Sequence, residues 1–385
     1  MPTFNTLSGT INLARLPLNK QEKLQAWDAA DELLLNHLNE HSSLDITARV
    51  LLINDQFGAL ACGLHRQQQE IVSWSDSFIA HLSTQYNLEL NQQTQPVTCL
   101  PSTESPVGTF DWVLIKIPKT LALLEHQLIS LKPHLTKHTI IIATGMVKYL
   151  QKSHQNLLEQ YLGSTKTSLA VKKARLYFCQ NDQHNAIPPS PYPEKYYLEE
   201  LNLHLSNHAN VFSREKLDIG SRFLLQQFEQ LPAAEVIVDL GCGNGVLGIC
   251  AQRQLPDSEV YFVDESYMAI ASAKENYQQQ FGESSSQHIN RHFVASDCLQ
   301  QLSLNKADLI LCNPPFHQNN TIGDEIAWRM FTQSKRMLGN NGVLWVVGNR
   351  HLNYHHKLKR VFNHCRTVAS NKKFVILMAQ QQPFL

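Results

Sequence analysis

Paired cysteines are missing from this sequence. Its eight cysteines are scattered singly and none forms a C-x-x-C pair, so we expect neither a metal site nor a disulfide framework. The sequence also lacks an uninterrupted apolar stretch of membrane-spanning length, and no charged segment followed by an apolar run opens it. We therefore expect no membrane partner, and a cytoplasmic protein with buried, reduced thiols.

An excess of charge of either sign is absent as well. The 33 Lys and Arg residues balance the 33 Asp and Glu residues, whereas domains that bind nucleic acids are often strongly basic. Any contact with RNA would therefore depend on local groups of cations. Short basic groups of this kind occur at Lys172, Lys173 and Arg175, at Lys357, Lys359 and Arg360, and at Lys372 and Lys373.

What the sequence does contain is enough apolar material for more than one domain. It has 385 residues, of which 43% are hydrophobic, and this length is typical of two or three globular domains. The polar, proline-rich segment 181–194 is unsuited to a buried element. We therefore predict a domain over 1–180, a linker over 181–194 and a second domain over 195–385.

The most informative motif is Asn313-Pro314-Pro315-Phe316, which follows the strand-like run 307–312. An Asn side-chain oxygen and a proline carbonyl can accept the two N–H hydrogens of an exocyclic amine. They would thereby aim its lone pair at a methyl donor, which is catalysis by positioning. The aromatic ring of Phe316 can stack on the flat ring that carries the amine. By itself the tetrapeptide is also compatible with an ordinary turn.

A glycine loop upstream argues against the interpretation of this motif as an ordinary turn. The apolar run 235–240 reads as a buried strand, 241–245 has the pattern G-x-G-x-G, and 246–251 continues with helical spacing. Glycines permit a close approach of the backbone to a ligand. The spacing differs from the dinucleotide pattern G-x-G-x-x-G. The preceding carboxylate, Asp239, suits a cofactor that carries an amino group and no phosphate.

Two further acidic residues follow strand-like runs. Asp264 ends the run 259–263, twenty-odd residues past the glycine loop, where a carboxylate can accept hydrogen bonds from ribose hydroxyls. Asp264 or Ser266 could instead cap the next helix. Asp297 follows the run 292–296, where an adenine amino group could be recognised, although a solvated turn is the alternative. The four elements in this order indicate a nucleoside-containing cofactor.

The first part of the chain repeats the second. Residues 50–54 resemble the run before Asp239, and residues 111–118 resemble 308–315. Thr167, Lys172 and Lys173 recur as Thr367, Lys372 and Lys373, at an offset of about 200 residues. We therefore predict two tandem α/β domains of Rossmann-like, doubly wound type. Two unrelated α/β domains are the alternative.

The chemistry of the first copy is degenerate. We align Asn54 with Asp239, and a loop with Phe57 and Leu60 replaces the glycine loop, so these two side chains would obstruct a cofactor. Lys116 brings a donor to the place where the Asn-Pro-Pro motif has an acceptor. We expect the first domain to bind or orient the RNA substrate.

The segment 210–220 precedes the second sheet and leads into a predicted helix over 221–228. It is placed to close over the site. Phe212 and Asp218 are candidate lid or substrate residues; core packing for Phe212 and a helix cap for Asp218 are the alternatives.

These motifs resemble those of class I S-adenosylmethionine-dependent methyltransferases. Over almost its whole length the chain resembles the ribosomal RNA guanine-N2 methyltransferases, which join a degenerate N-terminal methyltransferase domain to an active one, and it is most similar to those acting on the large subunit. The resemblance is carried by 239–245, 263–266 and 313–317, and by 26–31, 54–60, 117–123, 207–213 and 349–352. It implies methylation of the 2-amino group of one guanine in 23S ribosomal RNA, with S-adenosylmethionine as the methyl donor. We expect the protein to be a cytoplasmic monomer.

The resemblance also assigns roles to residues. Those implied to line S-adenosylmethionine are Asp239, Gly241, Gly243 and Gly245 at its methionine part, Asp264 at its ribose and Asp297 at its adenine. Those implied to hold a flipped guanine are Asn313, Pro314 and Phe316, with Pro315, His317 and Phe212 as further substrate contacts.

Alternatives remain at this level. A methyltransferase acting on a protein glutamine or a DNA adenine also presents an amine to such a motif, and a non-enzymatic RNA-binding scaffold is a third possibility. For the second domain we expect the strand order to reverse near Asp239, and an antiparallel strand around 374–378.

Overall fold

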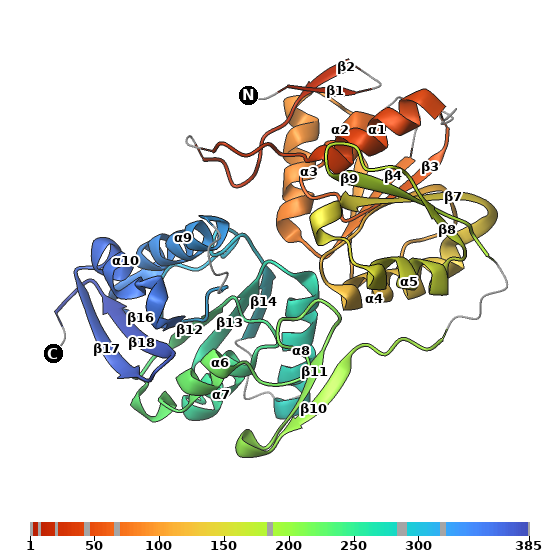
Figure 1. Cartoon of the computed structure of the whole chain (residues 1–385). Coiled ribbons are helices and arrows are strands. Elements are labelled where there is room, and N and C mark those ends of the chain that lie inside the picture. Colours follow the sequence, from red (N-terminus) through yellow and green to blue (C-terminus); the bar gives the residue numbers. More distant parts are fainter. Residues whose placement is uncertain are drawn as a thin grey trace. The chain divides into compact units, whose positions relative to one another are not determined.

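The computed structural model describes residues 3–6, 9–19, 22–41, 47–64, 70–182, 188–282, 291–315 and 321–383. The chain divides into two compact units, Met1–Tyr192 and Pro193–Leu385, and each is built around one sheet (Figure 1). The division falls inside the segment 181–194 that was predicted as a linker. In the described ranges, no helix combines the length and the apolarity needed to cross a bilayer.

The first unit is a seven-stranded mixed sheet with an N-terminal hairpin. Its elements are β1 (Thr3–Thr6), β2 (Gly9–Asn12), α1 (Ala29–His41), β3 (Arg49–Ile53), α2 (Ala59–Leu64), β4 (Glu70–Ser75), α3 (Phe78–Leu90), β5 (Val97–Pro101), β6 (Phe110–Lys116), α4 (Leu121–Leu131), η1 (Lys132–His134), β7 (Leu135–Met146), η2 (Val147–Tyr149), α5 (Lys152–Tyr161), β8 (Thr165–Thr167) and β9 (Ala174–Cys179). The strand order is β5-β4-β3-β6-β7-β9-β8, and β9 runs antiparallel to both of its neighbours, β7 and β8.

The second unit has the same architecture. Its elements are β10 (Glu194–Leu198), η3 (Glu199–Leu201), β11 (Leu203–Asn207), α6 (Ile219–Leu225), η4 (Phe228–Gln230), β12 (Val236–Leu240), α7 (Val246–Gln254), β13 (Glu259–Asp264), α8 (Tyr267–Phe281), β14 (Arg291–Ala295), β15 (Ala307–Cys312), α9 (Thr321–Met337), β16 (Leu338–Asn349), η5 (Arg350–Leu352), α10 (Tyr354–Val361), β17 (His364–Ser370) and β18 (Phe374–Gln380). The strand order is β14-β13-β12-β15-β16-β18-β17. The predicted antiparallel strand is β18, which lies between β16 and the edge strand β17.

The duplication predicted from the sequence is confirmed in detail. The two sheets have the same strand order, and each unit begins with a two-stranded hairpin. Ser77 caps α3 and Ser266 caps α8, each accepting a backbone N–H three residues later at 3.1 Å. Ten residues after each cap, Asn87 and Asn276 donate to a carbonyl of the loop after the first sheet strand, at 2.8 and 2.9 Å. Chance resemblance of two unrelated domains does not produce such matched contacts.

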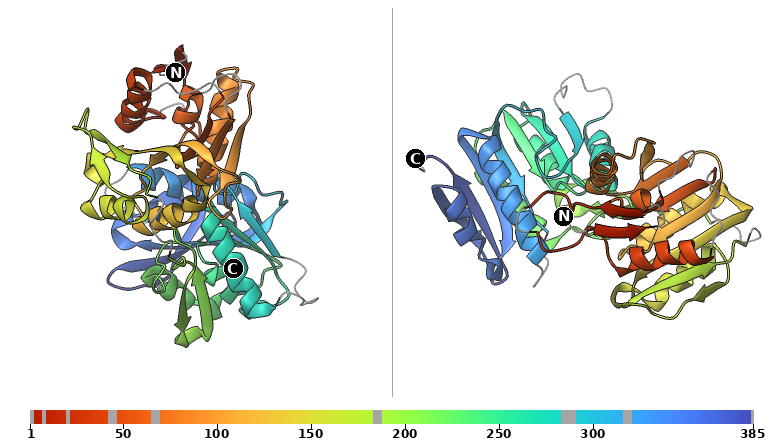
Figure 2. Two further views of the ribbon diagram at one scale, coloured as in Figure 1. Left: turned by 90° about the vertical axis from the view of Figure 1, so that its right-hand side faces the viewer. Right: turned by 90° about the horizontal axis from the view of Figure 1, so that it is seen from above.

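Helices cover both faces of each sheet (Figure 2). In the second unit, apolar side chains of α6, α7 and α8 form one core cluster, and those of α9 and α10 form another on the opposite face. Strand β12 alternates between them, because successive side chains of a strand point to opposite faces: Ile237 joins the first cluster, and Val238 and Leu240 join the second. Asp239 therefore points toward the α7 face.

Candidate active site

The carboxyl ends of β12 and β15 mark the point at which the strand order of the second sheet reverses. These two strands are neighbours, but the chain leaves β12 toward α7 on one face and leaves β15 toward α9 on the other. In open α/β sheets, ligands bind where the strand order reverses in this way. The glycine loop 241–245 and the segment 313–315 both start at this point, as the sequence predicted.

The glycine loop depends on conformations that other residues rarely adopt. Gly241, Gly243 and Gly245 have φ values of 74°, 53° and 82°. A Cβ on Gly245 would lie 3.0 Å from the Cα of Ala273, so this glycine permits α8 to pack against the loop. A Cβ on Gly243 would meet nothing within 4 Å. Gly245 is therefore required for packing, whereas Gly243 leaves open space beside the loop.

Asp239 is a buried carboxylate with one oxygen in use. Its side chain is 0% exposed, and Oδ2 accepts the backbone N–H of Gly248 at 2.8 Å. Its Oδ1 is buried and has no hydrogen-bond partner among the described residues. Burial raises the pKa of Asp239 to about 8; the nearby charge of Asp264 acts in the same direction, and the Gly248 N–H opposes it.

Asp264 links the second strand end to the glycine loop. Its Oδ2 accepts the backbone N–H of Gly243 at 2.9 Å, and its Oδ1 accepts that of Ser266 at 3.0 Å. The helix cap belongs to Ser266, whose hydroxyl accepts the N–H of Ala269. Asp264 is thereby held at the carboxyl end of β13, directly beside Gly243, the glycine of this loop at which a Cβ would meet nothing within 4 Å.

Asp297 is buried, with 2% of its surface exposed, and forms an ion pair with Arg329 of α9. Its backbone N–H donates to the side chain of Gln301 at 2.8 Å. The alternative of a solvated turn aspartate is therefore wrong. Sequence reasoning missed Arg329, because its partner lies 32 residues earlier in the chain and no local pattern joins the two.

Asn313 lies directly after β15, and its amide is oriented from α6. Its Nδ2 donates to Oδ2 of Asp218 at 3.0 Å and to Oγ of Ser221 at 2.8 Å. Its Oδ1 is buried and has no partner among the described residues. Pro314 is buried and Pro315 is half-buried. The site thus presents an unused carbonyl oxygen at the predicted position.

The remaining substrate candidates divide into two groups. Phe212 is 72% exposed, so its alternative role in core packing is wrong, and it stays available for a ligand. Asp218 caps α6 by accepting the backbone N–H of Ser221 at 2.9 Å, as its alternative interpretation predicted, and it contacts Asn313 as well. Phe316 and His317 lie outside the described residues.

The corresponding strand end in the first unit corrects one alignment made from the sequence. Leu52, and not Asn54, is in the place of Asp239, because both are the second-last paired residues of the first parallel strand. Asn54 corresponds to Gly241: its φ is 63°, and each of the two donates its N–H to the adjacent strand, at 3.0 and 2.8 Å. The sequence alignment matched two polar residues near a strand end, whereas the hydrogen-bond register of the strands decides which residues are equivalent.

The same register changes the account of why the first unit is degenerate. Leu60 corresponds to Leu247, and both are buried in their cores, so the expectation that Leu60 obstructs a site is wrong. Phe57 also packs against the core rather than blocking a cofactor. The first unit has Leu52 in the place of Asp239, although the buried Asp55 accepts the N–H of Ala61, the counterpart of Gly248, at 2.9 Å. An exposed Gln56 is in the place of Gly243.

Lys116 occupies the place of Asn313, as predicted. Its two partners lie at the start of α1, at the positions that Asp218 and Ser221 have at the start of α6. Its ammonium forms ion pairs with Asp28 at 2.9 Å and with Asp31 at 2.8 Å, at the start of α1. Burial opposes the charge on Lys116, but the two carboxylates outweigh it and raise its pKa. A donor-only side chain thus fills the position that has a free acceptor in the second unit.

Replacing Lys116 should destabilise the first unit strongly. Lys116→Met leaves the buried carboxylate of Asp31 without its cation, which costs about 3–5 kcal/mol of unfolding free energy. The exposed Lys166→Met should change it by less than about 0.5 kcal/mol. Chemical denaturation followed by circular dichroism measures both. Equal effects of the two variants would contradict the buried ion pair.

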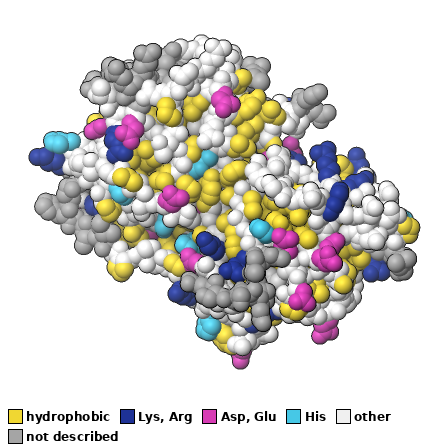
Figure 3. Space-filling view, turned by 180° about the vertical axis from the view of Figure 1, so that it is seen from behind, with side chains coloured by type: hydrophobic (Ala, Val, Ile, Leu, Met, Phe, Trp, Pro, Cys, Tyr) yellow, Lys and Arg dark blue, Asp and Glu magenta, His cyan; other side chains and the backbone are white. Residues whose placement is uncertain are grey.

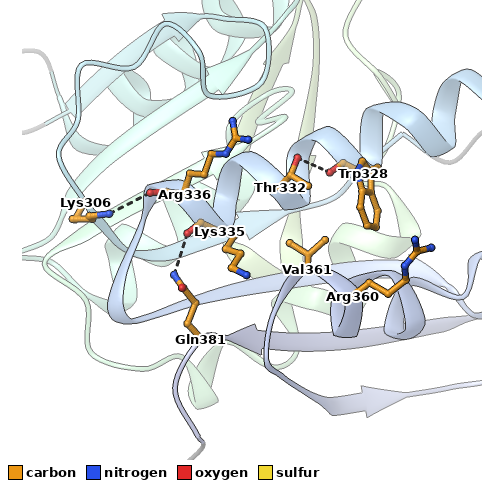
Figure 4. A pocket seen from close by; sticks show the side chains of 8 residues that line it. All are labelled: Lys306, Trp328, Thr332, Lys335, Arg336, Arg360, Val361 and Gln381. Carbon is orange, nitrogen blue, oxygen red and sulfur yellow. Dashed lines mark hydrogen bonds between the residues drawn. The ribbon is translucent and has the colours of Figure 1, made fainter. Parts of the chain in front are cut away.

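A surface cavity of about 560 Å³ lies at the end of the second sheet that is opposite the glycine loop (Figure 4). Its lining includes the residue before β15 and the last turns of α9 and α10, at the amino ends of the parallel strands; the residues are Lys306, Trp328, Thr332, Lys335, Arg336, Arg360, Val361 and Gln381. Cations are favourable at helix C-termini, and Lys306 and Gln381 donate to the final carbonyls of α9 at 3.2 and 3.1 Å. Lys306 and Gln381 thus serve to close the end of α9.

Comparison with known proteins follows the division into two units. Residues 1–183 match the family described as RLMG N-terminal domain, and residues 202–378 match the methyltransferase small domain. Relatives called ribosomal RNA large subunit methyltransferase G include one of Ectopseudomonas mendocina, 47% identical over 99% of this chain and 100% of its own length. One of Pseudomonas aeruginosa is 48% identical over 98% of this chain and 100% of its own length.

Among solved structures, the 16S rRNA N2 methyltransferase RsmC of T. thermophilus, in complex with AdoMet and guanosine, has the same fold as this chain. The TM-score is 0.77 at 17% sequence identity, covering 99% of this chain and 98% of the other.

Proposed function

This chain belongs to the family of ribosomal RNA large subunit methyltransferase G, and from that premise we propose that its second unit methylates the 2-amino group of a guanine in 23S ribosomal RNA. The methyl donor is S-adenosylmethionine. The observation that carries the proposal is the buried Oδ1 of Asn313 at the switch point of the sheet, which has no hydrogen-bond partner in the described part of the chain. Family membership sets aside the non-enzymatic scaffold.

The described residues fit this cofactor at two places. The unpaired Oδ1 of Asp239 suits a positively charged amino group, and the space beside Gly243 admits the methionine part next to the loop. Gly241 and Gly245 shape that loop through their positive φ values. Asp264 would accept hydrogen bonds from the ribose hydroxyls, since the N–H groups of Gly243 and Ser266 hold its carboxylate at the end of β13.

Asp297 would face the adenine, with its carboxylate oriented by Arg329. One oxygen is engaged by the guanidinium, so an adenine amino group would donate to the remaining acceptor capacity of the carboxylate. Burial of Asp297 makes such a contact strong, because water does not compete for it.

When bound, the cofactor would supply an electrophilic methyl group to the guanine nitrogen, and its sulfur would keep the electron pair of the broken bond. Asn313 Oδ1 and the Pro314 carbonyl would each accept one amine N–H, which aims the lone pair along the line of transfer. The nitrogen loses a proton during or after the transfer, for which water is a sufficient acceptor. Phe316 would stack on the flipped base, with Pro315, His317 and Phe212 as further contacts.

For the whole protein we propose a cytoplasmic monomer that needs no metal, with 23S ribosomal RNA as its partner and the first unit contributing to RNA binding. Figure 3 shows Lys and Arg side chains interspersed with Asp and Glu on the face that it presents. A balanced surface of this kind favours recognition by local groups over a general attraction to phosphates.

The function is tested by offering deproteinised ribosomal RNA, DNA and a glutamine-containing release factor with radiolabelled S-adenosylmethionine. We expect label in the large-subunit RNA, recovered as N2-methylguanosine after digestion. Label in DNA or protein with none in RNA would overturn the proposal. Mapping modified bases in ribosomal RNA from cells that lack this protein identifies the guanine.

Cofactor binding should release a proton from Asp239. With a pKa of about 8, this carboxyl is protonated in the free protein at about pH 6.5, and a cationic amino group beside it favours the ionised form. Affinity should therefore rise as the pH rises toward 8. Calorimetric titration in two buffers of different ionisation enthalpy should report the release of about one proton.

The control for this measurement is Asp239→Asn, which has nothing to ionise. It should bind the cofactor about 10- to 100-fold more weakly, with no proton release. Unchanged proton release in that variant would assign the ionisation to another group and contradict the role of Asp239.

A further inference from the structure

The amide of Asn313 is oriented by residues that belong to a different element. Asp218, the N-cap of α6, and Ser221, in the first turn of that helix, both accept from Nδ2, at 3.0 and 2.8 Å. A carboxylate only accepts hydrogen bonds, so it requires the NH₂ end of the amide to face α6. This settles which end of Asn313 points away from the helix: it is the carbonyl oxygen.

The opposite end of the same amide is unpaired. Oδ1 is buried and has no hydrogen-bond partner among the described residues, although buried polar atoms in folded proteins are almost always paired. An amide that is free to rotate would exchange its two ends to find a partner. The two acceptors on α6 prevent that exchange and keep Oδ1 available to an incoming hydrogen-bond donor.

In the first unit, the strand end is linked to the preceding helix in the same way, but no unpaired acceptor results. Lys116 contacts Asp28 and Asp31, which precede and begin α1 as Asp218 and Ser221 precede and begin α6. A lysine ammonium has only donors, so this connection leaves no acceptor behind. A link between the strand end and the helix is therefore common to both units, whereas an unpaired acceptor opposite the link belongs to the second.

We propose that Asp218 and Ser221 are positioning residues, which lock Asn313 in the orientation that accepts an N–H of the substrate amine. This inference rests on the proposed methyl transfer to guanine and adds the residues that make its Asn313 competent. Both act through Asn313 and neither contacts the reacting atoms. Asp218 is the more important of the two, since it lacks a proton that it could donate instead.

The test separates this role from the helix cap that Asp218 also provides. Asp218→Ser retains a capping hydroxyl, because Ser is among the best N-cap residues, but its shorter side chain does not extend to Asn313. Asp218→Asn retains both the cap and an oxygen that can accept from Asn313. We expect Asp218→Ser to lower kcat at least 30-fold, with KM for RNA and Kd for S-adenosylmethionine within threefold of wild type.

Asp218→Asn should rescue most of this loss, with kcat within about fivefold of wild type. Ser221→Ala, which leaves the carboxylate in place, should lower kcat by no more than about 10-fold. Thermal unfolding of all three variants checks that the helix cap and the fold persist. A kcat for Asp218→Ser within threefold of wild type would overturn the proposal.

A double-mutant cycle then asks whether Asp218 acts through Asn313. In the Asn313→Ala background, Asp218→Ser should change the residual kcat less than twofold, because the amide it orients is gone. A further loss as large as that in the wild-type background would overturn the proposal. If the wild-type protein itself transfers no methyl group to ribosomal RNA, the proposed function has failed, and this result is distinct from an active wild type with an equally active Asp218→Ser.

Discussion

Asn313→Ala should lower kcat for methyl transfer about 100-fold or more while cofactor affinity stays within a few fold of wild type. The substitution removes the buried Oδ1 that has no partner in the described structure, and with it one of the two acceptors for the substrate amine. Mispositioning of a reacting group by about 1 Å can cost 100-fold in rate. Single-turnover transfer of labelled methyl to ribosomal RNA measures the loss, and calorimetry measures cofactor binding.

The matched control is Asn363→Ala, which makes the same change at an exposed asparagine whose side chain donates to the carbonyl of Gln381 at 3.1 Å. Its kcat should remain within twofold of wild type. If Asn313→Ala also retained full turnover, catalysis by positioning of the amine would be the wrong mechanism for this protein.

Gly243→Val should abolish binding of S-adenosylmethionine, with Kd raised at least about 100-fold. The φ of 53° at this position costs an L-residue about 1–2 kcal/mol, and a branched side chain there would occupy the open space beside the loop. Strain alone lowers stability, whereas occupation of that space excludes the cofactor. Calorimetric titration and thermal unfolding report the two effects separately.

Gly282→Val supplies the control for strain. Gly282 also has a positive φ, of 80°, and a Cβ there would likewise meet nothing within 4 Å, but it lies at the far end of α8. Because its ψ of 160° puts Gly282 in a region that is essentially restricted to glycine, we expect a loss of stability at least as large, with unchanged cofactor affinity. Equal weakening of cofactor binding in both variants would show that Gly243 acts through the fold and not through the site.

Much of this architecture follows from local pattern. The apolar runs before Asp239, Asp264 and Asn313 became β12, β13 and β15 within one residue of their predicted bounds. Short buried strands with a turn after each are encoded by adjacent residues, because burial on both faces needs a continuous apolar run. The duplication was also readable, since a repeated fold repeats its apolar spacing.

The errors have a common cause. Asn54 was aligned with Asp239 because both are polar residues near a strand end, but hydrogen-bond register places Leu52 there. Leu60 was expected to obstruct a site and is instead a core residue. A sequence pattern locates a strand and its end to within a residue or two, whereas equivalence between two loops is a property of paired backbones.

By itself, the order of residues determined the two-domain α/β class, the site at the ends of the parallel strands and the chemical types of side chain gathered there. Only the tertiary structure decided how those side chains are used. Asp218 meets Asn313 across 95 residues of chain, and Arg329 meets Asp297 across 32. Such pairings depend on which helix covers which face of the sheet, and no local propensity carries that information. The orientation of one amide, on which the proposed chemistry depends, is therefore set by packing.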